Sequence, residues 1–203
     1  CDIQFGHVMR PTHTSNSWDA AKFEVCAHRY VDISEPAFGV AVINDGRYGH
    51  GVQDGGISVS LLRAAKFPDP LQDQGRHSVT IGILPHGPGL HDVIREAELL
   101  NTPLRFVAGG DAESVSRPVV SVEHAGVEVS AVKLADDGTG DLIVRVAEVC
   151  GDRVHVPVRP RGGITAAFLC DLLEEEQRAV DVADGFVNLP LRPFELVTLR
   201  LRS

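Results

Sequence analysis

Short apolar runs separated by Gly, Pro and Asp recur along almost the whole chain, and this pattern limits what the chain can fold into. Runs of this length suit strands, because most helices need about ten residues or more. Repeated short strands with few helical patterns between them are typical of antiparallel sandwiches. The sequence therefore predicts an all-β fold, with strands at 38–43, 57–62, 78–84, 119–122, 127–134, 142–149, 166–173, 186–189 and 196–201.

One short helix is expected at about residues 91–100. Four apolar residues recur there at helical spacing, namely Val93, Ile94, Ala97 and Leu100. Asn101 and Pro103 then end the pattern, so we interpret this helix as a connector. The Gly- and Ser-bearing segment that follows predicts a loop. Two β domains are therefore expected, 1–104 and 105–203.

The start of the chain indicates a fragment of a longer protein. Cys1 opens it without an initiator Met, and residues 2–6 already have the pattern of the middle of a strand. The length of 203 residues still allows a sizeable core, because a chain of this size buries roughly 70% of the surface that its unfolded form exposes. Core size is therefore no obstacle to folding.

Charge and composition exclude two classes of partner. The chain has 28 acidic and 19 basic residues and a formal net charge of −9, so it lacks the basic stripe that phosphate backbones require. No apolar run approaches the ~20 residues that span a bilayer. We expect neither nucleic acid nor a membrane as a partner.

The cysteines indicate a reducing compartment. Cys1, Cys26, Cys150 and Cys170 lie far apart and share no CxxC spacing, so neither a zinc knuckle nor a redox pair is expected. The sequence also has no Asn-X-Ser/Thr glycosylation site. These features favour free thiols in a cytoplasmic protein.

The nine histidines raise the question of a metal site. None has the HExxH spacing or another compact ligand pattern, so we expect histidines that hydrogen-bond backbone groups. A cluster assembled from separate loops is the alternative. The Asp residues of 136–141 resemble part of a calcium loop, but the remaining EF-hand ligands are missing and a turn is favoured. No metal or cofactor is expected in this chain.

Catalytic patterns are equally sparse. Residues 56–60 break the GxSxG pattern of a nucleophile elbow, and Cys26 on an apparent strand is a poor nucleophile. A glycosidase needs two carboxylates about 5 to 10 Å apart. The first half of the chain offers candidates that sequence alone cannot pair, namely Asp2, Asp19, Asp32, Asp45, Asp69 and Asp73. No catalytic residue is assigned.

The densest run of aromatic and polar residues lies in the first 50 positions. Within it, Asn44, Asp45, Arg47 and Tyr48 occupy a Gly-flanked loop, where donors, acceptors and an aromatic face project together. Such a loop suits recognition of a polar, hydroxyl-rich ligand. The alternative is an ordinary hairpin turn, because Asn and Asp before Gly are common turn formers.

Trp18 and His13 are expected to be structural. A lone Trp beside a Pro-bearing turn usually packs with its indole N–H satisfied. Stacking of a sugar ring on Trp18 is the alternative.

An ordered series of motifs resembles the C-terminal half of glycoside hydrolase family 38 α-mannosidases, in the cytosolic and vacuolar-type branch with many bacterial members. The match is strong over about residues 1–104 and weaker beyond. Its motifs are Arg10-Pro11-Thr12-His13, Ser17-Trp18-Asp19, Phe23-Glu24-Val25-Cys26-Ala27-His28-Arg29-Tyr30, Asn44-Asp45-Gly46-Arg47-Tyr48-Gly49, Pro68-Asp69-Pro70, Leu84-Pro85-His86 and Phe194-Glu195-Leu196-Val197-Thr198-Leu199.

The resemblance implies a retaining hydrolase of terminal α-D-mannosides. Zinc, an aspartate nucleophile and an acid carboxylate would belong to an N-terminal catalytic α/β domain that is missing from this chain. The chain itself would be the tail of a mutarotase-like β-supersandwich followed by a small immunoglobulin-like β-sandwich. It would be inactive alone and would pack on the catalytic domain.

Only the loop at 44–49 matches a motif that the resemblance assigns to the substrate. It implies that Arg47 and Tyr48 orient a mannose hydroxyl or a neighbouring sugar, while Asn44 and Asp45 hold the turn. Gly46 and Arg47 stand where Ser and Lys are common in the family. The positive charge is kept, but a guanidinium and an ammonium are not equivalent hydrogen-bonding groups, so this departure bears on the contact implied for Arg47.

Two other functions are consistent with the sequence. A free-standing carbohydrate-binding module is disfavoured by the small number of stacking residues, one Trp and two Tyr. A subunit-interaction module would dock the catalytic domain or a sister subunit. Half of a supersandwich leaves an unpaired face and edges, so we expect a homo-oligomer.

Overall fold

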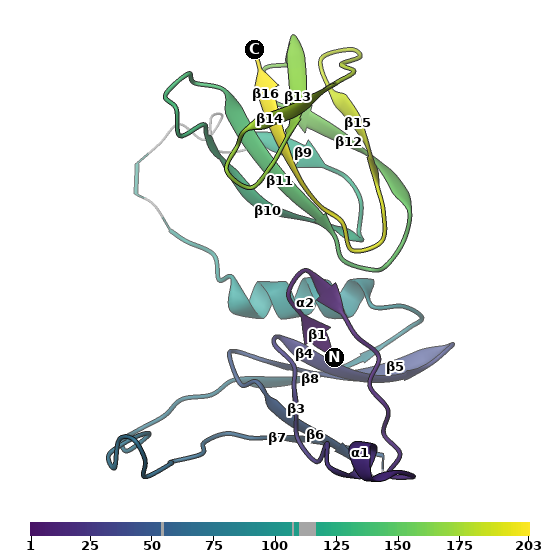
Figure 1. Ribbon diagram of the computed structural model, residues 1–203, viewed down its shortest axis with the longest axis vertical. Coiled ribbons are helices and arrows are strands. Elements are labelled where there is room, and N and C mark those ends of the chain that lie inside the picture. Colours follow the sequence, from purple (N-terminus) through teal and green to yellow (C-terminus); the bar gives the residue numbers. More distant parts are fainter. Residues whose placement is uncertain (54, 107, 110–116) are drawn as a thin grey trace. The chain divides into compact units, whose positions relative to one another are not determined.

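The computed structural model describes residues 1–53, 55–106, 108–109 and 117–203, and most of their regular structure is β-strand (Figure 1). The predicted all-β fold is confirmed. The chain folds as two compact units, Cys1–Arg105 and Phe106–Ser203, here called unit 1 and unit 2. Among the described residues, neither helix has the length and apolar character needed to cross a membrane.

Unit 1 contains three small antiparallel sheets, whose orders are β1-β2, β3-β6-β7 and β4-β5-β8. Its elements are β1 (Asp2–Ile3), β2 (Gly6–His7), α1 (Ser17–Ala20), β3 (Val25–Cys26), β4 (Tyr30–Glu35), β5 (Phe38–Asn44), β6 (Gly49–Gln53), β7 (Gly56–Val59), β8 (Ile81–His86) and α2 (His91–Asn101).

The expected helix is confirmed as α2, which packs on β4, β5 and β8 (Figure 1). Its buried face consists of Val93, Ile94 and Ala97, as the helical spacing predicts. The helix ends at Asn101, and the backbone N–H of Thr102 donates to the carbonyl of Glu98 over 2.8 Å. The short helix α1 was not expected.

Several strand predictions in unit 1 need correction. Residues 2–6 form no continuous strand, because Phe5 has a φ of 53° and the chain reverses there between β1 and β2. The strand expected at 57–62 ends at Val59. The strand expected at 78–84 lies two to three residues later, as β8. Sequence reasoning missed β4 and β6; β6 is rich in Gly and His, residues with little strand preference.

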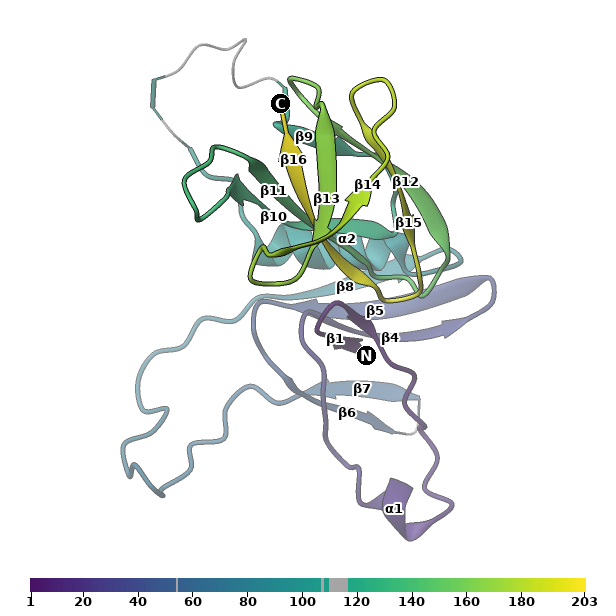
Figure 2. The same cartoon turned by 45° about the horizontal axis from the view of Figure 1, so that its top comes forward.

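Unit 2 is a sandwich of two antiparallel sheets, ordered β10-β11-β16-β13-β14 and β15-β12-β9 (Figures 1 and 2). Its core is almost entirely aliphatic, with Val144, Val158 and Leu199 fully buried. Its strands are β9 (Val120–Val122), β10 (Val127–Leu134), β11 (Leu142–Glu148), β12 (Val154–Pro160), β13 (Ala166–Cys170), β14 (Glu176–Val180), β15 (Val187–Leu191) and β16 (Leu196–Arg202).

Alternation of apolar and polar residues locates β10, and the pattern at 142–149 locates β11 to within a residue. Two strands were missed. Pro157 and Pro160 disfavour a strand at β12, yet β12 is the central strand of its sheet. The polar composition of β14 hides an edge strand, and β13 ends at Cys170 rather than at residue 173.

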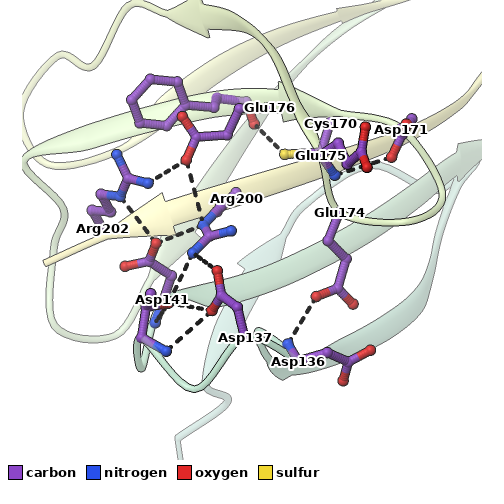
Figure 3. A network of polar contacts seen from close by, with 12 residues as sticks. Asp136, Asp137, Asp141, Cys170, Asp171, Glu174, Glu175, Glu176, Arg200 and Arg202 are labelled. Carbon is purple, nitrogen blue, oxygen red and sulfur yellow. Dashed lines mark hydrogen bonds and ion pairs between the residues drawn. The ribbon is translucent and has the colours of Figure 1, made fainter.

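The acidic turn between β10 and β11 is held by arginines of β16 (Figure 3). Arg200 Nε donates to Asp141 over 2.6 Å, and its Nη2 donates to Asp137 over 2.6 Å. Arg202 Nε also donates to Asp141, over 2.9 Å, and Arg202 Nη2 pairs with Glu176 of β14. The network therefore links the turn to the central and edge strands of one sheet.

Candidate functional site

The loop between β5 and β6 is organised by Asn44, which is fully buried. Its Oδ1 accepts the backbone N–H groups of Gly46 and Arg47, at 3.0 and 2.5 Å. Its Nδ2 donates to the carbonyl of His28 over 3.0 Å. Gly46 takes a φ of 115°, which a residue with a β carbon rarely adopts. Asn44 thus positions the loop and turns its backbone outward.

Asp45 holds the loop to the residues that precede β8. Its Oδ2 accepts the backbone N–H of Thr80 over 2.8 Å, and its own N–H donates to the Thr80 carbonyl over 3.3 Å. Hydrogen bonds from Thr80 lower the pKa of the exposed Asp45 carboxyl. Asp45 is therefore an anion that fixes the loop to the segment before β8.

Arg47 and Tyr48 line an open hollow of about 960 Å³. Tyr48 is 57% exposed, and its ring centroid lies 5.3 Å from that of His28 at an interplanar angle of 52°. The other lining residues are Phe23, Glu24, Val25, Cys26, Gly46, Gly49, Ser60, Leu61, Leu62, Arg63, Asp73 and His77. The loop thus presents one cation and one aromatic face to a cavity of ligand size.

The guanidinium of Arg47 is incompletely paired. Its Nε is buried and has no hydrogen-bond partner among the described residues. A buried N–H without an acceptor costs about 1–3 kcal/mol. An oxygen in the hollow would reach this buried Nε once the Arg47 side chain turned toward the hollow, so the unpaired Nε is the strongest sign of an incomplete site.

Part of the wall of the hollow comes from the segment between β7 and β8, which sequence reasoning did not connect to the site. Asp73 Oδ2 accepts the backbone N–H of Ala64 over 3.1 Å, and His77 Nε2 lies 2.9 Å from the Asp73 carbonyl. These contacts shape the segment that carries Leu61 and Arg63. A segment without strand periodicity gives no pairing from which its position could be inferred.

Gly49 sits at the point where Glu24 approaches the loop. A β carbon at this position would meet the Glu24 carboxylate and the Ser60 side chain, so a larger residue would have to displace the exposed Glu24 side chain. The pairing of β3 with β6 sets Cys26 opposite Gly49 and brings both elements to the hollow. This pairing brings together the residues at 23–26 and the loop at 44–49, which are far apart in the sequence.

His50 lies directly behind the loop and is fully buried. Its Nε2 is 3.4 Å from Asn44 Nδ2, and its Nδ1 has no partner among the described residues. Burial lowers the pKa of His50. The imidazole is therefore neutral at pH 7 and supports Asn44 rather than a charged ligand.

A second histidine forms a buried ion pair away from the hollow. His86 Nε2 lies 2.8 Å from Asp32 Oδ1, and His86 Nδ1 lies 2.8 Å from the Gly87 carbonyl. Both ring nitrogens face oxygen acceptors, so the ring is an imidazolium. A β carbon on Gly39 would overlap this ring, so glycine is required beside it. Within the part of the chain that the structure describes, no group of three or more His, Cys, Asp or Glu could hold a metal.

The expectation that Trp18 packs within the fold is wrong for this chain. Its side chain lies on α1 and is 83% exposed. The polar residues around it are well paired: Asp19 accepts from Lys22 over 2.7 Å and from Asn16 over 2.7 Å, and His13 Nδ1 lies 3.7 Å from Asp19. The cap of α1 is well fixed, and Trp18 projects from it.

Two family models match the chain in succession. The glycosyl hydrolases family 38 C-terminal domain matches residues 1–71, and the family 38 C-terminal beta sandwich domain matches residues 126–199. Among curated proteins, Alpha-mannosidase 2C1 of Homo sapiens is 40% identical over 207 residues, covering 98% of this chain and 20% of that protein. Alpha-mannosidase G of Dictyostelium discoideum is 34% identical over 220 residues, covering 100% of this chain and 19% of that protein.

Solved structures show the same fold. The crystal structure of an alpha-mannosidase from Enterococcus faecalis V583 aligns with a TM-score of 0.78 at 22% identity, covering 98% of this chain and 23% of that chain. The chain thus spans about one fifth of the length of the curated relatives it matches.

Proposed function

Because the chain belongs to the C-terminal part of glycoside hydrolase family 38, we propose that it is the non-catalytic β region of a longer α-mannosidase. In the whole protein, retaining hydrolysis of terminal α-mannosides takes place on an N-terminal α/β domain that holds the zinc. Unit 1 is the tail of the supersandwich and unit 2 is the terminal immunoglobulin-like sandwich. The protein acts in the cytoplasm, which is consistent with its four free cysteines.

In this proposal the loop at 44–49 faces the sugar. Arg47 and Tyr48 orient a mannose hydroxyl or a neighbouring ring, and Asn44 and Asp45 hold the turn. The buried and unpaired Nε of Arg47 carries the proposal, because a sugar hydroxyl would supply the acceptor that it lacks among the described residues once the Arg47 side chain turned toward the hollow. The half-exposed ring of Tyr48 supplies an apolar face beside it.

Packing on the catalytic domain is the second part of the proposal. The sheet β4-β5-β8 leaves Ile33, Phe38 and Ile83 exposed around a hollow of about 560 Å³. An apolar surface of this kind marks a contact with another domain or subunit. The same surface supports a subunit-interaction module and a homo-oligomer as the alternative function.

The loop is tested by Arg47→Ala in the full-length parent enzyme. We expect kcat/KM for an α-mannoside to fall, corresponding to a loss of about 1–3 kcal/mol of transition-state stabilisation, because one polar substrate contact is removed. Arg47→Lys should recover part of the loss, since it restores the charge without the planar fork. Arg76→Ala, an exposed arginine outside the hollow, is the matched control. Unchanged kinetics in Arg47→Ala would remove the loop from the site.

The division of labour is tested separately by assaying this chain beside the parent with a chromogenic α-mannoside. We expect turnover by the parent and none by the chain, with or without added zinc. Zinc-dependent turnover by the chain alone would contradict a non-catalytic role. Saturable mannoside binding by the chain alone would favour a free-standing carbohydrate-binding module.

A further inference from the structure

Unit 2 contains a basic hollow that the mannosidase proposal does not use. Its volume is about 390 Å³, and its charged lining consists of Arg153, Arg178, Arg192 and Glu195, with His155 beside them. The whole chain has 28 acidic and 19 basic residues. The lining of this hollow, with three arginines and one glutamate, is therefore basic in a chain that is acidic as a whole.

The hollow lies where the edges of the two sheets meet. Arg178 is on β14, the edge strand of the five-stranded sheet, and the β15 side is an edge of the three-stranded sheet (Figure 2). His155 of β12 pairs with Pro190 of β15. The position is therefore fixed by strand register, and Pro190 leaves no backbone N–H there to recruit another strand.

Only one of the three arginines is neutralised. The Glu195 carboxylate accepts three hydrogen bonds from Arg192. The donors are the backbone N–H, over 2.7 Å, and the side-chain Nε and Nη2, over 3.1 and 2.7 Å. The guanidiniums of Arg153 and Arg178 form neither a hydrogen bond nor an ion pair with any residue that the structure describes, although the charge of Arg153 helps to lower the pKa of Glu195. Two exposed guanidiniums thus face a cavity that holds one carboxylate.

We propose that this hollow binds a small oxyanion with two negative charges, of the phosphate monoester class. Guanidinium groups form paired, charge-assisted hydrogen bonds with phosphate oxygens. His155 adds a ring N–H in either neutral tautomer. A volume of about 390 Å³ accommodates a phosphorylated small molecule but not an extended polyanion. The pairing of Arg192 with Glu195 keeps the third arginine in place at the rim.

Inorganic phosphate is the probe for this site. We expect saturable binding to the 203-residue chain by NMR titration, with shifts confined to residues around β12, β14 and the 192–195 turn. Chloride at the same ionic strength should produce no saturable shift, because screening alone acts on all exposed charges. Absence of saturation up to about 10 mM phosphate would overturn the proposal.

The residues are tested by the double variant Arg153→Gln/Arg178→Gln. We expect phosphate affinity to fall by at least about tenfold, since both unpaired guanidiniums are lost. Lys66→Gln/Arg76→Gln removes the same charge from exposed positions of unit 1 and should leave affinity unchanged. Equal affinity in both variants would contradict the assignment. Arg178→Gln alone, at an exposed edge-strand position, gives the same test if the double variant does not fold.

Discussion

Unit 2 closes its own core, whereas unit 1 does not. In unit 2 the apolar faces of both sheets meet in one aliphatic cluster that includes Val146, Val156 and Leu201. In unit 1, α2 covers one face of β4-β5-β8, yet Phe38 and Ile83 are 50% and 74% exposed. A small domain depends on burying most of its apolar area, so unit 2 is the self-sufficient half of the chain.

The units also differ in how they use buried charge. Unit 1 buries the pair of Asp32 and His86, whose side chains are 6% and 2% exposed. Unit 2 buries Glu148, which accepts the backbone N–H groups of Cys150, Gly151 and Phe194 at 2.9, 2.8 and 2.9 Å. The first depends on a protonated ring and the second on an ionised carboxylate, so these two buried groups respond to pH in opposite directions.

Leu199→Ala should produce the largest difference in stability between the two units. Leu199 is fully buried in the central strand β16, so the truncation should cost about 2–5 kcal/mol. Urea unfolding followed by hydrogen exchange should show unit 2 losing protection at lower urea while unit 1 keeps its own midpoint. Val132→Ala, at a 41% exposed position of β10, serves as control. Equal losses in both units would mean that they unfold as one.

A pH series tests the opposite use of charge. Burial acts to lower the pKa of His86, but hydrogen bonds to Asp32 and the Gly87 carbonyl raise it above its usual 6.5. Its contribution to unit 1 is therefore present below pH 6.5 and is lost as pH rises through the folded pKa. Hydrogen exchange should show unit 1 opening more readily as the pH is raised above neutrality.

Unit 2 should instead weaken in acid. Burial acts to raise the pKa of Glu148, but its backbone donors lower it, and the Arg200 hydrogen bond lowers the pKa of Asp137 from 3.8 to about 2. These contributions are present above the unfolded values and are lost as pH falls through the folded ones. Protection in unit 2 should fall between about pH 4.5 and 2. If unit 2, like unit 1, lost protection above neutrality, the contrast between Glu148 and His86 would be disproved.

The smallest change in stability is expected from Ile83→Thr. The position is 74% exposed, so the free energy of unfolding should change by less than about 0.5 kcal/mol. Self-association of the chain, measured by light scattering at micromolar concentrations, should nevertheless weaken. Leu134→Thr, at a 66% exposed position of unit 2, should leave association unchanged. If the unsubstituted 203-residue chain were monomeric, the expected homo-oligomer would be contradicted.

Short apolar runs located most strands of unit 2, but β12 and β14 were missed for two different reasons. The helix α2 could be located because its apolar residues follow a single helical period, and β10 because apolar residues recur along it on both sides of a register shift at 129–131. β12 was missed because its prolines are tolerated between two partners that only tertiary pairing supplies. β14 was missed because an edge strand needs few apolar residues.

The candidate site was predictable in part for the same reason. The Asn-Asp-Gly sequence indicated a turn, and the turn is present with Asn44 at its base. Part of the wall of the hollow depends on a long segment without periodicity, so Arg63 and His77 could not be placed near Arg47. The exposure of Trp18 likewise could not be predicted, because local composition does not encode which side of α1 packs on the fold.

Asn101 gives the connector helix a mechanical role. Its Nδ2 donates both to the Ala97 carbonyl over 2.8 Å, within α2, and to the Asn44 carbonyl over 2.9 Å. The last residue of the helix is therefore attached to the base of the loop that carries Arg47. Tension applied to the chain at Thr102 would first strain its hydrogen bond to the Glu98 carbonyl and then the Asn101 attachment, so a pull at this end of α2 is transmitted to the loop.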